Sequence, residues 1–404
     1  KVSGDTITNQ MRRLGSSCDW DSEYFTMDAI RSKVVQKAFV TLFNQGLIYR
    51  GNRLVNWDPV LMTAISDLEV VTEDTDGFIW TIKYPLLDEE NCSRPIHMET
   101  LSVATTRPET ILGDVAVAVN PHEERYRELV GRLVRVPIIN RAVPIVADDS
   151  VDMDFGTGCV KITPAHDFND YDVGKRNKLE IINIFTEEGK INENAPSDYV
   201  GLDRFEARKK ILNELGDKLI KEENIKNKVP YGDRSNSVIE PYLTEQWFAD
   251  AKKLSVKAKK IVKNKKTKFF PPNWSKTYFQ WMNNIEPWCI SRQLWWGHQI
   301  PAWYGPDKKI FVATNETEAK KQAKKFYKKD VKITRDPDVL DTWFSSGLWP
   351  FATLGWPDKK DFVKKFYPTS VLVTGFDIIF FWVARMIMFG TEFLNKEPFK
   401  DIYV

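Results

Sequence analysis

Two polar segments of the chain combine side chains that could bind and activate a ligand. The first is ATTRPETILGD, residues 104–114, and the second is FGTGCVKITPAHDFNDYDVG, residues 155–174. Both are rich in hydroxyl groups, glycines and charges, whereas a segment that only packs in a core would be apolar. Six side chains fall beside Gly or Pro breaks at the ends of predicted strands: Arg107, Thr110, Lys161, Thr163, Asp167 and Asp170. We therefore expect the two segments to form one pocket.

The spacing within the second segment supports a shared pocket. Lys161 and Thr163 are two apart on a predicted strand, so they point to the same face. Asp167 and Asp170 are three apart, so they share one face of the start of a helix. The glycines of residues 156–158 allow the backbone to approach a ligand closely. A purely structural interpretation stays open, because either aspartate could be a helix N-cap, Thr163 could be an ordinary strand residue and Arg107 could be a surface charge.

The composition is that of a globular protein with a large core. The 404 residues are 42% hydrophobic and 28% charged, and the formal net charge is +2. This balance excludes a strongly basic protein, so contact with nucleic acid would need a local patch. Scattered cysteines without a CxxC pair, and histidines without metal-ligand spacing, predict no zinc site and suit a reducing cytoplasm. These residues are Cys18, Cys92, Cys159, Cys289, His97, His122, His166 and His298.

Residues 371–389, VLVTGFDIIFFWVARMIMF, are long and apolar, but they contain Asp377 and Arg385. A membrane-spanning helix rarely carries two charges near its middle, so we predict a buried strand followed by a buried helix, and no membrane partner. Residues 371–375 are predicted to be buried on both faces, as in a parallel sheet. Asp377 would lie just beyond the carboxyl end of this strand, where open α/β sheets bind ligands.

The elements that position these residues change in type along the chain. Residues 1–75 favour a helix that begins after Asp28 and stops at Gly46, followed by extended chain. Alternating apolar residues and intervening turns then predict short strands in a small barrel or curved sheet. These strands cover 78–84, 101–105, 115–119, 133–136 and 143–146, with helices at 169–179 and near 203–215. From about residue 229, a lysine-rich segment (251–268) and many tryptophans follow; the lysines form a solvated helix face or lie along a nucleic-acid backbone.

The two motifs resemble the editing domain of class I aminoacyl-tRNA synthetases of the valine, isoleucine and leucine group. Within that group TTRPETILGD and FGTGCVKITPAHDFNDYD are most similar to the valyl enzymes. The resemblance implies an α/β fold in which an inserted β-barrel-like editing domain, residues 76–228, interrupts a Rossmann-like catalytic domain. Residues 1–75 would be part of that catalytic domain and a linker, and residues 229–404 its second half. An isoleucyl enzyme, or a non-catalytic or stand-alone tRNA-binding editing protein, is the alternative.

In that family the pocket hydrolyses the ester of a mischarged tRNA, here threonine on the tRNA for valine. An apolar valine site cannot strongly reject threonine, and this pair is itself the known example, at about a hundredfold. The resemblance adds Phe155 to the pocket, where it would stack on the terminal adenine. We assign the ligand's ammonium group to Asp170 first and Asp167 second. Substrate binding is expected from Arg107, Thr110, Phe155 and Asp170, and catalysis from Lys161, Thr163, Asp167 and Asp170, with a positioned water and no covalent intermediate.

Residues 289–304, 336–356 and 373–386 resemble the second half of the catalytic domain. This resemblance places Trp296 and Trp343 at the valine pocket and Gly375 and Asp377 beside the ATP ribose. It implies ATP as a substrate, with Mg²⁺, and tRNA(Val), valine and threonine (as its ester) as partners. The HIGH-like and KMSKS-like signatures and the zinc-binding cysteines of some relatives are not in the sequence. We therefore expect an internal piece of a cytoplasmic, monomeric valine-specific ligase that is competent for editing alone and has no zinc.

Overall fold

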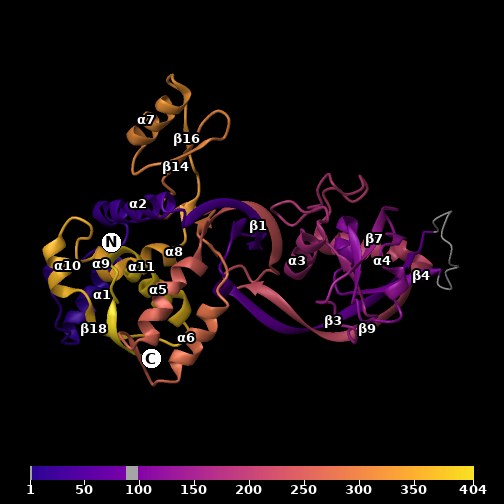
Figure 1. The fold of residues 1–404 in the computed structure, drawn as a ribbon, viewed down its shortest axis with the longest axis horizontal. Helices are drawn as coiled ribbons and strands as arrows, with labels where there is room; N and C mark the ends of the chain where they lie inside the picture. The colour runs from indigo at the N-terminus through magenta and orange to yellow at the C-terminus, as the bar shows by residue number, and fades with distance from the viewer. Residues whose placement is uncertain (1, 88–98) are drawn as a thin grey trace. The chain divides into compact units, whose positions relative to one another are not determined.

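The structure, a computed structural model, describes residues 2–87 and 99–404, so Cys92 and His97 lie outside it. The chain folds as two compact units (Figure 1). The β-rich unit comprises Tyr49–Ala249 and Cys289–Leu294. The helical unit comprises the chain through Ile48, Asp250–Trp288 and Trp295–Val404. The predicted mixed α/β class is confirmed, and the predicted domain at 76–228 lies inside the β-rich unit, which extends beyond it on both sides.

Two sheets carry the central part of the β-rich unit. The first has the order β4-β3-β9 and is antiparallel throughout. The second has the order β6-β7-β5-β8, with β5 parallel to β7 and antiparallel to β8. β4 also packs against β8, so the two sheets enclose a common core. The strands are β3 (Val70–Pro85), β4 (Thr100–Thr105), β5 (Ala116–Val119), β6 (Leu133–Arg135), β7 (Ala142–Ala147), β8 (Cys159–Ile162) and β9 (Leu219–Gly232).

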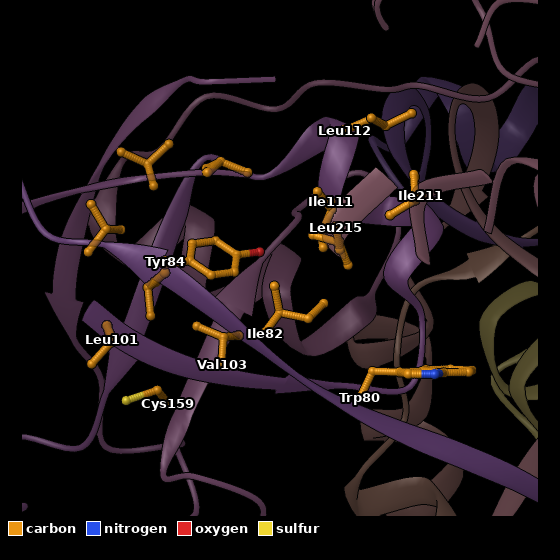
Figure 2. Close-up of a cluster of buried hydrophobic side chains, with 14 of the residues drawn as sticks. Trp80, Ile82, Tyr84, Leu101, Val103, Ile111, Leu112, Cys159, Ile211 and Leu215 are labelled. Carbon is orange, nitrogen blue, oxygen red and sulfur yellow. The ribbon is translucent and has the colours of Figure 1, made fainter. Parts of the chain in front are cut away.

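The core follows from the period-two alternation of β3 and β4. Ile82 and Tyr84 of β3 are fully buried and pair with Val103 and Leu101 of β4. Because alternate strand residues share a face, these four side chains point into the same cluster, with Trp80 at its edge (Figure 2). Burying an aliphatic or aromatic side chain contributes about 1.5–3 kcal/mol, so this cluster is a main source of the unit's stability.

Two helices complete the β-rich unit at the predicted places. α3 (Phe168–Asn177) begins at Asp167, and α4 (Arg204–Leu215) begins at Asp203, each aspartate accepting hydrogen bonds from the helix's first turn. Ile211 and Leu215 of α4 join the core shown in Figure 2. A further sheet has the order β12-β10-β1-β2. Its strands are β1 (Ile48–Asp58), β2 (Thr63–Ala64), β10 (Glu240–Ala249) and β12 (Trp288–Cys289), and β13 is Ser291–Arg292.

The helical unit contains the helix predicted between Asp28 and Gly46. The Asp28 side chain accepts from the Arg31 N–H at 2.7 Å and caps α2, and Gly46 follows with φ +69°. The helices are α1 (Val2–Arg13), α2 (Ala29–Asn44), α5 (Ala251–Lys263), α6 (Trp274–Asn283), α7 (Glu316–Tyr327), α8 (Thr342–Gly347), α9 (Trp349–Ala352), α10 (Lys360–Phe366) and α11 (Ala384–Leu394). The strands are β11 (Lys268–Phe270), β14 (Ala302–Tyr304), β15 (Ile310–Val312), β16 (Thr334–Arg335), β17 (Val339–Leu340), β18 (Thr369–Val373) and β19 (Phe399–Tyr403).

Residues 371–375 form a strand of a parallel sheet, as predicted, but the prediction that both faces of this strand are buried is wrong. β18 runs parallel to β19 in a sheet of order β11-β19-β18. Val371 and Val373 are nevertheless 46% and 77% exposed. Alternate strand residues share a face, so the exposure of Val371 and Val373 shows that one face of β18 is uncovered among the described residues. The helix α11 that follows is buried as predicted, and no described helix has the length and apolarity to cross a membrane.

Candidate active site

One cavity of the β-rich unit brings together all seven residues assigned to the predicted pocket. Its volume is about 520 Å³, and its lining includes Arg107, Thr110, Phe155, Lys161, Thr163, Asp167 and Asp170. The first motif contributes the end of β4 and the 3-10 turn Pro108–Gly113. The second motif contributes β8 and the start of α3. Segments about 50 residues apart in the sequence therefore line one cavity.

A buried carboxylate that the sequence analysis did not assign, Asp114, orders the polar groups of β8. Its Oδ1 accepts from Lys161 Nζ at 3.1 Å and from the Thr163 hydroxyl at 2.8 Å, and its Oδ2 accepts from the Tyr84 hydroxyl at 2.7 Å. All of its partners are donors, as an ionised carboxylate requires. Burial raises the pKa of Asp114, and the Lys161 ammonium is the largest opposing effect. The signal in the sequence was its place as the last residue of the first motif.

The same contacts define what Lys161 and Thr163 offer to a ligand. Lys161 donates to Asp114 and to Thr163, so the third N–H of its ammonium remains for a ligand in the described part of the structure. The Thr163 hydroxyl donates its single hydrogen to Asp114, so it can only accept a hydrogen bond from a ligand. The pair can thus hold one donor and one acceptor of a water or a substrate hydroxyl.

Asp170 supplies a carboxylate whose charge is poorly compensated. Its Oδ2 accepts from the backbone N–H of Thr163 at 2.8 Å, and the residue is 9% exposed. Burial, followed by the nearby charge of Asp167, raises the pKa of Asp170 to about 7, against the effect of Lys161. Its other oxygen makes no hydrogen bond with a described residue, so it can pair with a cationic group of a ligand.

Asp167 has both of the roles that the sequence left open. Its Oδ1 accepts from the N–H groups of Asn169 at 2.8 Å and Asp170 at 3.1 Å, so it is the N-cap of α3. It also lines the cavity. The structural interpretation is therefore correct for Asp167, and it does not remove the residue from the site.

Arg107 is held by protein groups on all three nitrogens. Its Nε donates to Glu109 at 3.2 Å, one terminal nitrogen donates to the His166 carbonyl at 2.8 Å, and the other pairs with Glu240. Burial lowers the pKa of Arg107, but these carboxylates outweigh it and leave the pKa raised. The Arg107 side chain is 27% exposed, so it reaches the cavity while it joins the two motifs.

Two further arginines complete this buried ionic network. Arg204 pairs with Glu240 at 2.9 Å, and the Nε and one terminal nitrogen of Arg208 donate to the two carboxylate oxygens of Glu109, at 2.8 and 2.9 Å. Glu109 and Glu240 are 1% and 3% exposed. Sequence reasoning missed Glu240, because it lies 133 residues from Arg107 and in no motif.

His166 is not placed to act as a base. It is 1% exposed, and its Nε2 accepts from the Ile184 N–H at 3.0 Å. Burial, together with the charges of Arg107 and Lys161, holds its pKa well below the usual value. The neutral ring therefore carries its proton on Nδ1, which is buried and without a partner among the described residues. Its ring packs against Phe185 at a centroid distance of 4.5 Å, which supports a structural role.

Phe155 and the glycines after it shape the rim of the cavity. Phe155 is 57% exposed, which leaves a ring face open for stacking. Gly156 has φ +61°, and a Cβ there would lie 2.7 Å from the Cβ of Ala104 on β4. Gly156 is therefore required where the backbone approaches β4, whereas the predicted approach of residues 156–158 to a ligand stays a prediction.

The residues predicted to bind valine and ATP lie in the helical unit. Trp296 is 69% exposed, with its ring centroid 6.5 Å from that of Phe25. Trp343 has a different aromatic neighbour, Phe381, at 6.3 Å. Gly375 and Asp377 are exposed and follow the carboxyl end of β18, as predicted. A shared valine pocket for the two tryptophans remains a prediction.

Comparison with known proteins identifies the family. The family described as tRNA synthetases class I (I, L, M and V) matches residues 1–404. The chain is 69% identical over 403 residues to a valine–tRNA ligase of Pelagibacter ubique, covering 99% of this chain and 45% of that protein. It is 57% identical over 404 residues to the enzyme of Legionella pneumophila (strain Lens), with 100% and 43% coverage. It is 56% identical over 416 residues to that of Caulobacter vibrioides, with 100% and 46% coverage.

The chain thus spans less than half the length of the relatives it matches. The family match nevertheless covers every residue, and residues of the two polar motifs line one cavity. The chain belongs to the class I tRNA synthetases of the isoleucine, leucine, methionine and valine group.

Proposed function

We propose that the cavity of the β-rich unit hydrolyses the threonyl ester of tRNA(Val). The observation that carries this proposal is the convergence of acids, a lysine and hydroxyls of both motifs on one cavity of about 520 Å³. In the reaction, a water oxygen bonds to the ester carbon and the bond to the ribose oxygen breaks. The ribose oxygen takes a proton, and threonine leaves as the acid.

The contacts suggest a role for each group. Asp170 would pair with the ammonium group of the threonyl ester through its free oxygen, and Asp167 is the second choice. Lys161 would donate to the developing oxyanion, and the Thr163 hydroxyl would accept a hydrogen of the attacking water. These roles require only the donor and acceptor that Asp114 leaves available on each side chain.

The remaining cavity residues would hold the tRNA terminus. Phe155 offers an exposed ring for the terminal adenine, where stacking contributes roughly 1–3 kcal/mol. Thr110 donates its hydroxyl hydrogen to the Arg107 carbonyl at 3.0 Å, so it stabilises the loop that carries Arg107. Because the nitrogens of Arg107 already have protein partners, it would contribute positive potential and a fixed loop rather than a free fork for a phosphate.

Several relatives of this chain are valine–tRNA ligases, which supports a wider activity. We infer that the complete protein is a valine–tRNA ligase that joins valine to tRNA(Val) at the expense of ATP. Trp296 and Trp343 would contact valine, and Gly375 and Asp377 would approach the ATP ribose. Asp377 alone does not make a magnesium site, and the described residues hold no cluster of three His, Cys, Asp or Glu side chains that fits a metal ion. No step is therefore assigned to a metal.

A deacylation assay tests the editing proposal. The chain should hydrolyse threonyl-tRNA(Val) and spare valyl-tRNA(Val), because a polar cavity accepts the threonine hydroxyl and gains nothing from a methyl group. Asp170→Ala should lower the rate by at least about a hundredfold, within the range of a lost charge-assisted contact. Asp172→Ala, an exposed position on α3, is the matched control and should keep the activity. Equal rates on both esters would reject the assignment, and preferred hydrolysis of valyl-tRNA(Ile) would favour the isoleucyl alternative.

A further inference from the structure

A core residue of the β-rich unit, Tyr84, carries a hydroxyl group that packing alone does not require. Tyr84 lies on β3, is fully buried and pairs with Leu101 of β4 in the apolar cluster of Figure 2. A phenylalanine would fill the same place with a ring of nearly the same shape and no polar atom. A buried phenol hydroxyl needs a hydrogen-bond partner, because burial without one costs free energy. The partner of Tyr84 therefore indicates what the hydroxyl does.

This partner is the carboxylate of Asp114, which links the core to the hydrolytic cavity. The Tyr84 hydroxyl donates to Asp114 Oδ2 at 2.7 Å. Lys161 and Thr163, which line the cavity, donate to Oδ1 at 3.1 and 2.8 Å. One oxygen of the carboxylate is thus held by a core side chain and the other by cavity side chains. Tyr84 is not among the described residues that line the cavity, so any effect on a ligand passes through Asp114.

The Tyr84 hydrogen bond fixes the orientation of the Asp114 carboxylate. The backbone of Asp114 is already held, because its N–H donates to the Ile111 carbonyl at 3.1 Å and its carbonyl accepts from Arg141 at 2.9 Å. The freedom that remains is rotation of the carboxylate about its last bond, for which the intrinsic preferences are broad. Because a carboxylate is planar, a bond that holds Oδ2 also sets the position of Oδ1. Asp114 is fully buried, so the Tyr84 hydroxyl is not readily replaced by solvent.

The same hydrogen bond favours the ionised form of Asp114. Burial, followed by the charge of Asp114, raises the pKa of Tyr84 well above its usual value, so the hydroxyl keeps its proton and donates it. Burial also raises the pKa of Asp114, and the Lys161 ammonium and the Tyr84 hydrogen bond are the two largest opposing effects. The other charge near this carboxylate is Asp170 on α3, whose own pKa Asp114 raises. Without the Tyr84 hydroxyl, Asp114 should therefore take up a proton at a higher pH.

We propose that Tyr84 is a positioning residue of the hydrolytic site, which holds the Asp114 carboxylate and through it the Lys161 donor and the Thr163 acceptor. This inference rests on the proposed function, in which these two groups bind the developing oxyanion and the attacking water. Groups that are fixed before the substrate arrives need no reorganisation when charge develops on the ester. The core strand β3 thus contributes to hydrolysis without contact to the substrate.

Tyr84→Phe, made in the 404-residue chain, removes the hydroxyl and keeps the ring. It should lower kcat for threonyl-tRNA(Val) by about 10-fold or more, the equivalent of a hydrogen bond to a charged group. KM should stay within about twofold of the parent value, since no contact to the substrate is lost. The pH below which the rate falls should move upward, because the site needs an ionised Asp114.

Tyr199→Phe is the matched control. Tyr199 is 2% exposed, belongs to the same core cluster and donates its hydroxyl hydrogen to the Glu214 carboxylate at 2.7 Å, outside the cavity. The control loses the same type of bond and should keep the parent kcat and pH profile. Thermal unfolding followed by circular dichroism confirms that each variant is folded at the assay temperature. If Tyr84→Phe is not, a ring-fluorinated tyrosine at position 84 replaces it; this group is a stronger donor and should move the acid limit of the rate to lower pH.

The outcomes separate the role of Tyr84 from the proposed function. A parent that hydrolyses threonyl-tRNA(Val) while Tyr84→Phe keeps its kcat and pH profile would overturn the role of Tyr84 alone. Equal losses in Tyr84→Phe and Tyr199→Phe would also overturn it, since they would report a weakened core. A parent that hydrolyses neither threonyl- nor valyl-tRNA(Val) would reject the proposed function and, with it, any role of Tyr84 in hydrolysis.

A double variant tests whether Tyr84 acts through Asp114. Tyr84→Phe should cause no further loss of kcat when it is added to Asp114→Asn, because the carboxylate that it holds is then absent. Single-turnover hydrolysis compares the double variant with Asp114→Asn alone. A further loss of 10-fold or so would show that Tyr84 acts by another route and would contradict the positioning role.

Discussion

Among single side chains, Asp114 determines most of what the proposed site can do. It is fully buried, and it directs Lys161 and Thr163 by accepting a hydrogen bond from each. A carboxylate in a low-dielectric environment is costly unless it is paired, so its partners are constrained as strongly as it is. Lys161 and Thr163 therefore present a fixed donor and a fixed acceptor, which is the preorganisation that stabilises a developing charge.

Replacement of this carboxylate tests its positioning role. Asp114→Asn should cost about 3–5 kcal/mol in the free energy of unfolding, because Lys161 is left buried without its anion. It should also lower kcat for threonyl-tRNA(Val) by at least about a hundredfold. Urea unfolding and single-turnover hydrolysis measure the two effects. The double variant Asp114→Asn, Lys161→Met should recover stability and remain inactive; an active double variant would contradict the assignment.

At the scale of elements, the start of α3 combines structure and chemistry in one residue. Asp167 caps the helix with two N–H contacts and lines the cavity. An asparagine caps a helix about as well as an aspartate, whereas alanine does not. The two functions of Asp167 can therefore be separated by the choice of replacement.

The corresponding prediction compares two variants of one position. Asp167→Ala should lower the free energy of unfolding by about 0.5–2 kcal/mol, and Asp167→Asn by a few tenths. If the charge contacts the substrate, both should slow hydrolysis by about 10-fold or more, the equivalent of a lost charge-assisted hydrogen bond. Thermal melts and deacylation rates are the measurements. An active asparagine variant would show that Asp167 acts as a cap alone.

The lysines of helix α5 were expected to form either a solvated face or a surface for nucleic acid, and their contacts favour one of the two. Lys253 pairs with Asp250 at 3.0 Å, Lys257 with Glu392 at 2.9 Å, and Lys252 with Glu286 at 3.3 Å. The opposite face of the helix buries Leu254, Ala258 and Val262. Since several of the lysines form ion pairs within the protein, the contacts favour a solvated amphipathic helix over a nucleic-acid surface.

At the scale of the whole molecule, the sequence predicted what is local and missed what is distant. The residues of the cavity could be named because strand spacing and helix starts place Lys161, Thr163 and Asp170 within one continuous segment. Glu240 could not, because its pairing with Arg107 depends on how β10 returns to the site. The exposure of β18 could not be predicted either, because an apolar strand has the same sequence pattern whether or not another element covers its face.

The free energy of unfolding of the whole molecule should depend on pH because of the buried Asp170 carboxyl group. Its folded pKa of about 7 lies above the ordinary value of 3.8, so the folded state binds a proton that the unfolded state has released between these values. Unfolding then releases that proton, and stability falls as pH rises from about 4 to about 7. The full effect is on the order of 4 kcal/mol, of which about 3 kcal/mol lies between pH 5 and pH 8. The free energy of unfolding of Asp170→Asn, measured relative to that of the parent, should therefore rise by about 3 kcal/mol from pH 5 to pH 8.

Urea unfolding of the parent and the variant at pH 5 and pH 8 measures this difference. His166, whose lowered pKa makes acid destabilising, is present in both proteins and cancels in the comparison. Asp172→Asn, at an exposed position on the same helix, is the control and should show no such gain. If the difference in free energy of unfolding between Asp170→Asn and the parent stays constant with pH, the pKa of Asp170 is not raised by the fold. The cavity would then have to recruit the ammonium group of the ester by means other than an uncompensated carboxylate.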